Sequence, residues 1–356
     1  MFGRLRNIAK RRRGDASAHL ERVRAELAEL ASGDGPVLAG PFVGEVGFEL
    51  LYWLPFVRWA VEQEPGLRRR LVLVSRGGTG SWAADLDVAG YVDVLSLLSP
   101  EDLARRRPAL KQREVSAFDD ELLAAVRDHL GVHDAGVLHP SLLYNLYYDV
   151  VKRDRRAFAA AVTPTDHGAS GLAASYRPIA APAGPPPEAG LPDEYVAVRF
   201  YGRASLPDNA DNQVLVRRLV ANLADKVPVV LLGHDLELDD HSDIAVGRGE
   251  RIFSVAHLMR PADNLDVQTR ILAGARGFVG TYGGLSYLAP SLGQSSLALS
   301  SSLESLQPWH LDLAQQVFAM PGFGSLACVM SEDSELLDLA FGGLVQGARG
   351  LPGRSL

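Results

Sequence analysis

The sequence predicts an α/β fold made of two Rossmann-like domains that face a central cleft. Continuous apolar runs such as 71–74 and 229–232 are typical of strands that are buried on both faces of a parallel sheet. Helix-like stretches separate these runs, as they do in βαβ units. A Pro-rich segment around 181–187 divides the chain into two similar halves, which therefore predict two domains.

The first half contains the elements of one parallel sheet in order. A polar helix is expected at 17–31, before the first strand. Strands are expected at 37–43, 71–74 and 91–95, with another from 137, and helices at 50–63 and 118–130. The loops at 44–49 and 75–81 follow strands, and loops at the carboxyl ends of parallel strands form ligand sites.

The second half repeats this architecture, although the two halves share no recurring sequence motif. Strands are expected at 195–200, 229–232, 252–255, 275–280 and 296–299, and helices at 213–226, 265–275 and 332–346. The expected divisions are a basic N-terminal segment and helix (1–32), a first Rossmann-like domain (33–175), a Pro-rich linker (176–193), a second Rossmann-like domain (194–330), and a closing helix and tail (331–356) that packs back toward the first domain.

Composition and charge exclude several classes of protein. The 356 residues are 47% hydrophobic, which is enough for two cores. The formal net charge of −7 argues against a nucleic-acid binder, which needs a basic surface. The single cysteine, Cys328, excludes a disulfide framework. The apolar runs stay short of the roughly 18 residues that span a bilayer, so a cytoplasmic protein is expected.

The N-terminus carries a basic cluster that ends in Lys10–Arg13. It is not a secretory signal, because no apolar segment follows it. One interpretation is a solvated basic tail. The alternative is a peripheral contact with an anionic membrane surface, for which Phe2, Leu5 and Ile8 lie at helical spacing.

The segment Gly280–Gly293 predicts an anion site. It follows an apolar run, contains the adjacent glycines Gly283 and Gly284, and opens a helix-like stretch. Backbone amides at a helix N-terminus bind phosphate, and glycines let the phosphate approach the backbone closely. The hydroxyls of Thr281 and Ser286 are expected to add donors. A phosphate-bearing ligand is therefore the first hypothesis.

Motifs for other phosphate and metal chemistries match poorly. Gly44 and Gly47, after the first strand, do not complete a G-x-G-x-x-G element, which disfavours a nicotinamide enzyme. The chain has no G-x-x-x-x-G-K-[ST] element, which argues against a P-loop ATPase or kinase. His234 and His241 lie among aspartates, a pattern that we interpret as a solvated loop and not as a metal site.

Two stretches resemble glycosyltransferases of the GT-B fold, and among them the heptosyltransferase-like group. Val43–Pro55 resembles the G-D-x-x-x-x-x-x-P element of those enzymes, and Gly280–Gly293 resembles their D-T-G-x-x-H-L-A donor-phosphate motif. The chain departs from the second motif at Gly280, where the family has Asp, and in the tyrosines Tyr282 and Tyr287. The resemblance covers the layout of both halves, and these two motifs carry it.

The first half is expected to bind the acceptor and to supply the catalytic base. The resemblance implies that Glu45, at the position of the family's Asp, is this base, and Glu49 on the next helical turn is the second candidate. The acceptor side is expected to include Gly44, Gly47, His139 and Tyr144. The alternatives are helix capping for Glu45 and core packing for the histidine and the tyrosine.

The second half is expected to bind the donor. Residues expected at the donor diphosphate are Arg199, Arg203, Thr281, Tyr282, Gly283, Gly284 and Ser286. Residues expected at the nucleoside are His234, Asp263 and Asn264. The alternatives are a salt bridge between the domains for Arg199, a solvated loop for Arg203, and an ordinary helix cap for the last two residues of the nucleoside set.

These expectations describe a glycosyltransferase that moves a sugar from a nucleotide-sugar donor to a hydroxyl of a glycan, a lipid-linked or a small-molecule acceptor. The resemblance implies a metal-independent reaction, and inversion at the sugar carbon is expected. The nucleotide sugar is a substrate, and neither a cofactor nor a nucleic-acid partner is expected. Two alternatives stay open, namely a nucleotide-sugar epimerase on the same fold and a non-catalytic protein that binds a phosphosugar or glycan.

Overall fold

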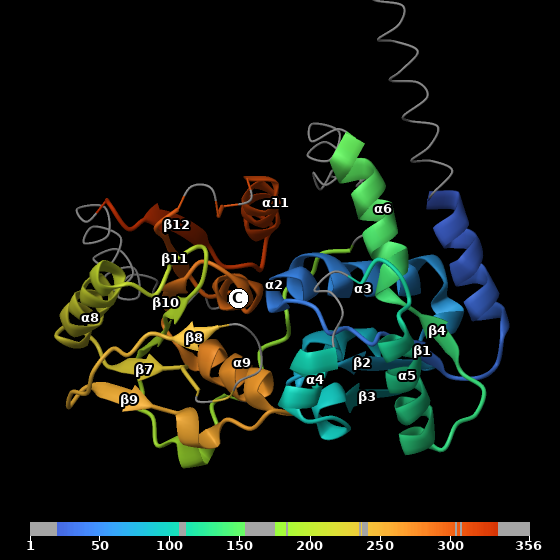
Figure 1. The fold of residues 1–356 in the computed structure, drawn as a ribbon, viewed down its shortest axis with the longest axis horizontal. Helices are drawn as coiled ribbons and strands as arrows, with labels where there is room; N and C mark the ends of the chain where they lie inside the picture. The colour runs from blue at the N-terminus through green and yellow to red at the C-terminus, as the bar shows by residue number, and fades with distance from the viewer. Residues whose placement is uncertain are drawn as a thin grey trace, which may run out of the picture. The chain divides into compact units, whose positions relative to one another are not determined.

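A computed structural model describes residues 20–106, 112–153, 175–182, 184–234, 236, 241–302, 305–306 and 308–333. The chain divides into two compact units, Met1–Tyr176 and Arg177–Leu356. Figure 1 shows a sheet with helices around it in each unit, which confirms the α/β class. The cleft between the domains stays a prediction. The basic segment at 1–19 and nearly all of the closing helix expected at 332–346 lie outside the described residues.

The first unit contains a parallel sheet with the strand order β3-β2-β1-β4. Its strands are β1 (Val37–Ala39), β2 (Leu71–Ser75), β3 (Gly90–Asp93) and β4 (Gly136–Leu138). Because β1 pairs with β2 on one side and with β4 on the other, the order reverses beside β1. Open parallel sheets bind ligands at such a reversal, outside the carboxyl ends of the strands. The loops after β1 and β4 are therefore the first place to look for a site.

The helices expected at 17–31, 50–63 and 118–130 are present, the first of them from residue 20, where the description begins. They correspond to the helical residues 20–32, to α3 (Leu54–Gln63) and to α5 (Ala117–Leu130). The structure adds α2 (Val46–Phe48), α4 (Pro100–Arg106) and α6 (Pro140–Arg153), which the sequence analysis did not predict, and the short turns η2 (Pro65–Leu67), η3 (Thr79–Leu86) and η4 (Val94–Ser96). A capping box of Ser116 and Asp119 starts α5. The strand expected at 91–95 ends early because Asp93 accepts the N–H of Leu95 and so caps η4.

The first helical segment after β1 contains a π turn, η1 (Glu49–Trp53), between α2 and α3. Pro55 has no N–H to donate to the carbonyl of Leu51 four residues earlier. The hydroxyl of Tyr176 donates to that carbonyl at 3.1 Å. π turns are frequent at functional sites, and this one begins with Glu49.

The second unit contains a parallel sheet with the strand order β12-β11-β10-β5-β7-β9. Its strands are β5 (Val196–Arg199), β7 (Val229–Leu231), β9 (Ile252–Ser254), β10 (Phe278–Thr281), β11 (Ser296–Ser300) and β12 (Leu326–Met330). The order reverses between β5 and β10, as it does in the Rossmann sheets that bind nucleotides. After β5 the chain forms β6 (Tyr201–Gly202), which pairs antiparallel with β8 (Ser242–Asp243).

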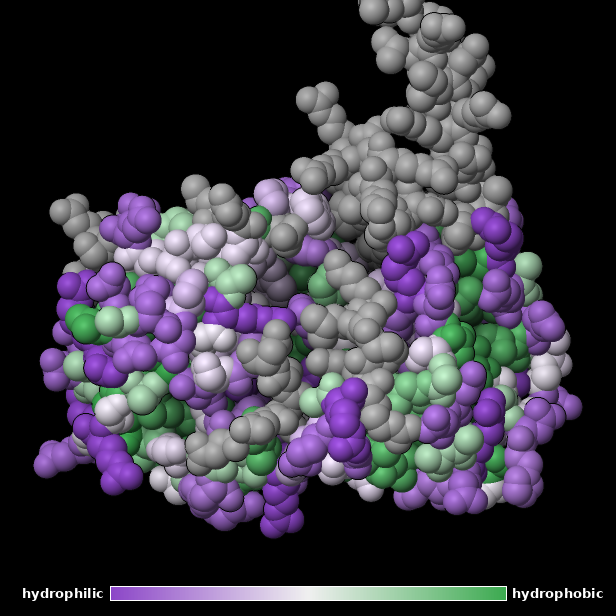
Figure 2. All heavy atoms as spheres, viewed as in Figure 1, coloured by the Kyte–Doolittle hydropathy of each residue, from purple (hydrophilic) through white to green (hydrophobic). Residues whose placement is uncertain are grey.

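The helices of the second unit are α8 (Ala210–Ala224), α9 (Asn264–Gly274), α10 (Gly284–Ser291) and α11 (Pro308–Phe318), with short turns η5 (Pro187–Ala189) and η6 (Ala256–Leu258). α8 begins before the expected residue 213 because Asn209 caps it and accepts the N–H of Asn212. Its apolar face packs in one core with strands β5, β10 and β11, through residues that include Val216, Leu219, Val220, Val196, Val279 and Leu297. Figure 2 shows mostly hydrophilic side chains over the outer side of α8, with some hydrophobic atoms among them, and Val214 of this helix is exposed, so the helix is amphipathic with one apolar exception.

Candidate functional site

The reversal point of the second sheet carries the expected glycine loop. β10 leads through Gly283 into α10, so the strand, glycine loop and helix are present as the sequence predicts. Gly283 and Gly284 are half-buried. The first amides of a helix have no partner within the helix, and amides in this position attract phosphate. The candidate anion site therefore lies where Rossmann sheets bind nucleotides.

The two hydroxyls expected to reach a ligand are used inside the fold. Thr281 is 0% exposed, and its Oγ1 accepts the N–H of Tyr201 at 2.9 Å and donates to the carbonyl of Tyr201 at 3.0 Å. Ser286 Oγ donates to the carbonyl of Gly283 at 2.7 Å and accepts its N–H at 3.1 Å. In this structure both hydroxyls therefore donate to backbone carbonyls, and their bonds to a phosphate stay a prediction. These hydroxyls fix the backbone of the loop.

Two glycines of this segment, Gly280 and Gly283, are required by neighbouring protein atoms. A Cβ at Gly280 would lie 2.1 Å from the carbonyl oxygen of Arg199, and a Cβ at Gly283 would lie 2.0 Å from the hydroxyl oxygen of Tyr201. Their lack of a side chain therefore permits close packing on β5 and β6. Sequence reasoning assigned this freedom to the phosphate and missed Tyr201, whose hydroxyl lies at the glycine loop.

Tyr282 and Tyr287, the two departures from the family motif, form one buried pair. The hydroxyl of Tyr287 donates to that of Tyr282 at 2.6 Å, and the rings meet edge to face with centroids 5.8 Å apart. Burial raises the pKa of Tyr282 to about 12, so this hydroxyl stays protonated near neutral pH. Tyr282 was expected at the donor phosphate, but its hydroxyl already has a partner inside the unit.

Arg199 ends β5 and is held within its own unit. Its Nε lies 3.0 Å from Oδ1 of Asp243, and a terminal nitrogen donates to Oε1 of Gln268 at 3.3 Å. The guanidinium lies 5.5 Å from the centroid of the Tyr201 ring. The salt bridge between domains that was the alternative for Arg199 is therefore wrong, because its carboxylate partner belongs to the same unit.

Asp243 joins two of the expected donor residues. Its Oδ1 takes the ion pair of Arg199, and its Oδ2 accepts the backbone N–H of His234 at 2.7 Å. The Nδ1 of His234 accepts the N–H of Leu236 at 3.3 Å. The loop after β7 is thus connected to the end of β5 through one carboxylate that sequence reasoning read only as part of a solvated cluster.

Asn264 and Asp263 stabilise the entry of α9. Asn264 is buried and donates to the carbonyl of Pro261 at 2.7 Å, and Asp263 accepts the N–H of Arg260 at 3.1 Å. Asp263 occupies the N-cap position without a side-chain bond to the helix. Gln268 donates to the carbonyl of Asn264 at 3.0 Å, so a buried polar chain runs from α9 to Arg199. Asn264 is therefore part of the buried interior, and it is connected to Arg199 only through Gln268.

Arg203 lies in a turn that is tied to the glycine loop. Its N–H and carbonyl both bond to the backbone of Leu206 at 3.0 Å. Within the turn, Ser205 Oγ donates to the carbonyl of Tyr282 at 3.1 Å. The hydrogen bond from Ser205 therefore fixes this turn to the backbone of the glycine loop at the reversal point.

The loop after β1 contains Glu45 and is held by a buried arginine. Arg76, 4% exposed, donates to the carbonyl of Gly44 from Nε at 3.2 Å and from a terminal nitrogen at 2.8 Å. Glu45 is half-buried at the N-cap position of α2, which contains Gly47, and makes no side-chain cap bond. Glu45 thus occupies the N-cap position that the capping interpretation gives it, and Arg76 fixes the loop that carries its carboxylate.

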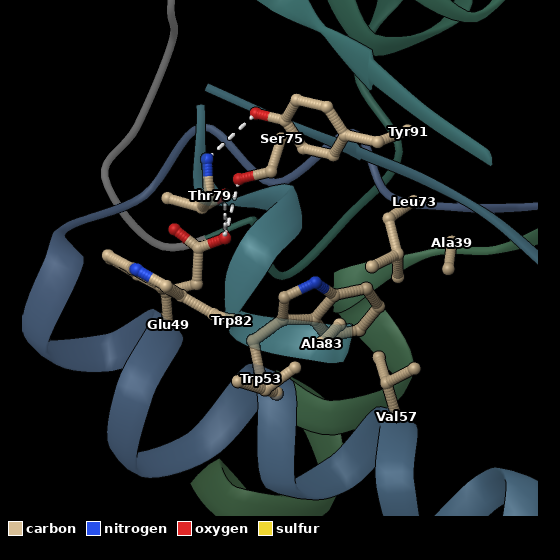
Figure 3. Close-up of a pocket in the computed structure, with 11 residues that line it drawn as sticks. Ala39, Glu49, Trp53, Val57, Leu73, Ser75, Thr79, Trp82, Ala83 and Tyr91 are labelled. Atoms are coloured by element: carbon tan, nitrogen blue, oxygen red, sulfur yellow. Dashed lines mark hydrogen bonds between the residues drawn. The ribbon is translucent and has the colours of Figure 1, made fainter. Parts of the chain in front are cut away.

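Glu49 lies deeper than Glu45 in the same segment. It is 5% exposed, and its Oε1 accepts the hydroxyl of Ser75 at 2.5 Å and that of Thr79 at 3.0 Å, as Figure 3 shows. Burial raises the pKa of Glu49 to about 7, although these hydrogen bonds and the charge of Arg76 oppose the rise. Near neutral pH this carboxyl therefore exists in both protonation states.

A second buried carboxyl completes this polar cluster. Asp93 accepts the hydroxyl of Tyr91 at 2.6 Å and the N–H of Gly78 at 2.7 Å, and burial raises its pKa. Beside Glu49 lies a cavity of about 10 Å³, lined also by Tyr91 and Trp82, which is about the size of one water molecule and too small for a sugar. Sequence reasoning missed Ser75, Arg76, Thr79, Tyr91 and Asp93, although the polar loop that follows the apolar run 71–74 could have indicated some of them.

His139 and Tyr144 lie after β4, beside the reversal point of the first sheet. Nδ1 of His139 accepts the N–H of Ser141 at 3.1 Å, and Nε2 lies 3.7 Å from Oδ2 of Asp119. His139 is therefore buried just before α6, and its ring accepts an N–H of the first turn of that helix.

Tyr144 is 6% exposed, and its ring centroid lies 6.2 Å from that of Phe48. Its hydroxyl has no hydrogen-bond partner among the residues that the structure describes.

Within the described ranges, no group of three or more His, Cys, Asp or Glu side chains is placed to hold a metal ion. Asp235, Asp239 and Asp240, from the acidic cluster around His234, lie outside those ranges.

The sequence matches no protein-family model and no curated protein. The chain is similar in fold to the E. coli heptosyltransferase WaaC with ADP, at 16% identity and a TM-score of 0.47, over 86% of this chain and 99% of the other. It is also similar to E. coli ADP-heptose LPS heptosyltransferase II, at 15% identity and a TM-score of 0.48, over 89% of this chain and 100% of the other.

A third similar structure is a family 9 glycosyltransferase from Veillonella parvula, at 11% identity and a TM-score of 0.43, over 90% of each chain. These proteins belong to the group that the two motifs resemble. At such identities and TM-scores, no likeness carries a function over to this chain.

Proposed function

We propose that this protein is a glycosyltransferase that moves a sugar from a nucleotide-sugar donor to a hydroxyl acceptor, without a metal ion and with inversion at the sugar carbon. The observation that supports this most directly is the glycine loop at the reversal point of the second sheet. Tyr201 links the parts of this site, because its ring contacts the guanidinium of Arg199 and its hydroxyl approaches Gly283. A diphosphate fits the amides and the positive charge gathered there.

The donor site must stabilise a leaving group. When the bond between the sugar and the diphosphate breaks, the diphosphate gains negative charge, and fixed amides and cations stabilise that charge without reorganising. The first amides of α10 would supply the fixed dipoles, and Arg199 and Arg203 the positive charge. Arg199 is already paired with Asp243. A bound diphosphate therefore either shares the guanidinium of Arg199 with this carboxylate or displaces the carboxylate from it.

Glu45 is the proposed base for the acceptor hydroxyl. The acceptor oxygen attacks the sugar carbon opposite to the diphosphate, the new C–O bond forms as the old one breaks, and the hydroxyl proton passes to Glu45. Glu45 is half-buried on its loop, whereas Glu49 is buried with Oε1 bonded to two hydroxyls. The geometry therefore favours Glu45 as the group that a substrate can reach.

The proposed acceptor is a glycan, a lipid-linked sugar or a small molecule. A lipid-linked acceptor would bring the protein to a membrane surface. The basic residues before residue 14 would then be attracted to anionic lipids. Among the helices that the structure describes, none has both the length and the apolar character to cross a bilayer. Peripheral contact of the basic N-terminal residues with such a surface is part of this proposal.

A thermal-shift screen of nucleoside diphosphates and nucleotide sugars tests the donor site. A ligand at a hundredfold excess over its Kd stabilises the folded protein by about 2.7 kcal/mol. The screen should find at least one nucleotide, and its sugar derivative should be consumed when an acceptor is added. No shift with any nucleotide would refute the donor site. Conversion of the nucleotide sugar to an epimer without acceptor would identify an epimerase, and binding without turnover a binding protein.

A further inference from the structure

The hydroxyl of Tyr144 is an unusual feature of the first unit. It is buried, yet it has no hydrogen-bond partner among the described residues. A buried polar group without a partner is rare in proteins, because the bonds it made to water are lost and not replaced. Such a hydroxyl is accounted for if a ligand or a water supplies the missing bond.

The fold places Tyr144 next to the candidate base. Tyr144 lies in the second turn of α6, which follows β4, and Glu45 follows β1. β1 and β4 are paired side by side up to Ala39 and Leu138, so the segments that follow them leave the sheet together. The ring of Phe48, three residues after Glu45, contacts the ring of Tyr144. Both residues therefore belong to the reversal point of the first sheet.

The charges around this hydroxyl restrict its ligand. Burial, and then the negative charges of Glu45 and Glu49, raise the pKa of Tyr144, so its hydroxyl keeps its proton and can donate it. The same two carboxyl groups repel an anion. A neutral alcohol suits the position, because its oxygen can accept from Tyr144 while its hydrogen is donated to a carboxylate.

We propose that Tyr144 and Glu45 together form a subsite for one neutral hydroxyl of a carbohydrate. Tyr144 donates to the oxygen of this hydroxyl, and Glu45 accepts its hydrogen. As the acceptor site of a transferase this inference rests on the function proposed above, where the same proton passes to Glu45 and Tyr144 keeps its own. As a binding site it concerns the first unit alone.

Two tyrosine variants test whether the hydroxyl of Tyr144 has a partner in the protein itself. Tyr144→Phe removes only the oxygen and keeps the ring beside Phe48, so its Tm should equal or exceed that of the wild type. Tyr195→Phe is the matched control, because that buried hydroxyl donates to the carbonyl of Ile271 at 2.7 Å. The control should lower Tm by about 2 to 4 °C. An equal loss in Tyr144→Phe would overturn the proposal.

Methyl hexopyranosides, measured by NMR titration, are the probes of binding. Tyr144→Phe should weaken the tightest glycoside about tenfold, as expected for one lost hydrogen bond, and Tyr195→Phe should leave it unchanged. A monodeoxy analogue that lacks the bridging hydroxyl should bind the wild type and Tyr144→Phe equally. Equal affinity of the parent glycoside for both proteins, or no glycoside binding by the wild type, would overturn the subsite.

The nucleotide screen separates this inference from the proposed function. If no nucleotide binds but glycoside binding depends on Tyr144, the transferase proposal fails and the subsite stands. If nucleotides bind and are turned over while Tyr144→Phe behaves as the wild type with every glycoside, the subsite alone fails.

Discussion

The glycine loop of the second unit and the Glu45 loop of the first unit occupy equivalent places, since each lies at the reversal point of a parallel sheet. They are held in different ways. Neutral hydroxyls fix the glycine loop. The hydroxyl of Thr281 bonds to the backbone of Tyr201, and that of Ser286 donates to the carbonyl of Gly283. A buried cation fixes the other loop, because Arg76 donates twice to the carbonyl before Glu45, and carboxyl groups balance its charge.

This difference corresponds to the two tasks in the proposed reaction. A loop that receives a diphosphate can be built from neutral dipoles, because the positive charge would come from Arg199 and Arg203 outside the loop. A loop that carries a base can rest on ionisable groups, but its stability then depends on their protonation. We therefore expect pH to act mainly on the first unit and nucleotides on the second.

The largest expected effect comes from Glu45, the proposed base. Glu45→Gln keeps the size of the side chain but removes proton uptake, so transfer should slow by about 10²- to 10⁴-fold. The donor affinity, measured by calorimetry, should not change, because the proposed donor site belongs to the other unit. Glu64→Gln, just after α3, is the control and should keep full activity. Normal turnover by Glu45→Gln would assign the base to another residue.

Loss of the buried cation should destabilise the first unit. Arg76→Met leaves the carbonyl of Gly44 and two buried carboxyl groups without their cation, at a cost of about 3 to 5 kcal/mol. Arg76→Lys keeps the charge and should cost less. Urea unfolding followed by tryptophan fluorescence measures this, since Trp53, Trp59 and Trp82 all lie in this unit. A loss no larger than that of the exposed Arg69→Met would show that Arg76 does not hold the loop.

Much of the architecture could be predicted because it depends on local patterns. The apolar runs, the loops between them and the glycine loop before α10 are each visible within about 15 residues of sequence. The roles of Thr281 and Gly283 could not be predicted, because both depend on Tyr201, about 80 residues away. A hydroxyl beside glycines suits a phosphate or a backbone bond equally well, and only the fold decides between them.

The two carboxylates after β1 show the same limit. Sequence spacing cannot tell which of Glu45 and Glu49 is buried, and it gives no view of Arg76, whose bond partner Gly44 is 32 residues away. The continuous apolar run Leu50–Pro55 after Glu49 could have indicated that its segment is buried. That the hydroxyl of Tyr144 has no hydrogen-bond partner among the described residues is a property of packing and has no sequence signal.

Titration of Glu49 gives the next largest effect. Between its ordinary pKa of 4.5 and about 7, the folded protein holds a proton that the unfolded chain releases. The stability of the wild type relative to Glu49→Gln should therefore fall as pH rises through this window, by on the order of 3 kcal/mol, and stay constant above it. Urea unfolding of both proteins from pH 5 to 8 measures the difference. Parallel profiles would show that Glu49 titrates normally.

The smallest expected effect tests the neutral construction of the glycine loop. Thr281→Val removes the hydroxyl that bonds both backbone groups of Tyr201, at a cost of about 1 to 3 kcal/mol. Because Tyr201 lies against Gly283, donor affinity should fall as well, and neither change should depend on pH, since no ionisable group is altered. Thr281→Ser keeps the hydroxyl and should retain donor affinity in calorimetry. If both variants bind the donor equally weakly, the methyl group and not the hydroxyl positions the loop, and the contrast between a neutral and an ionisable construction no longer explains donor binding.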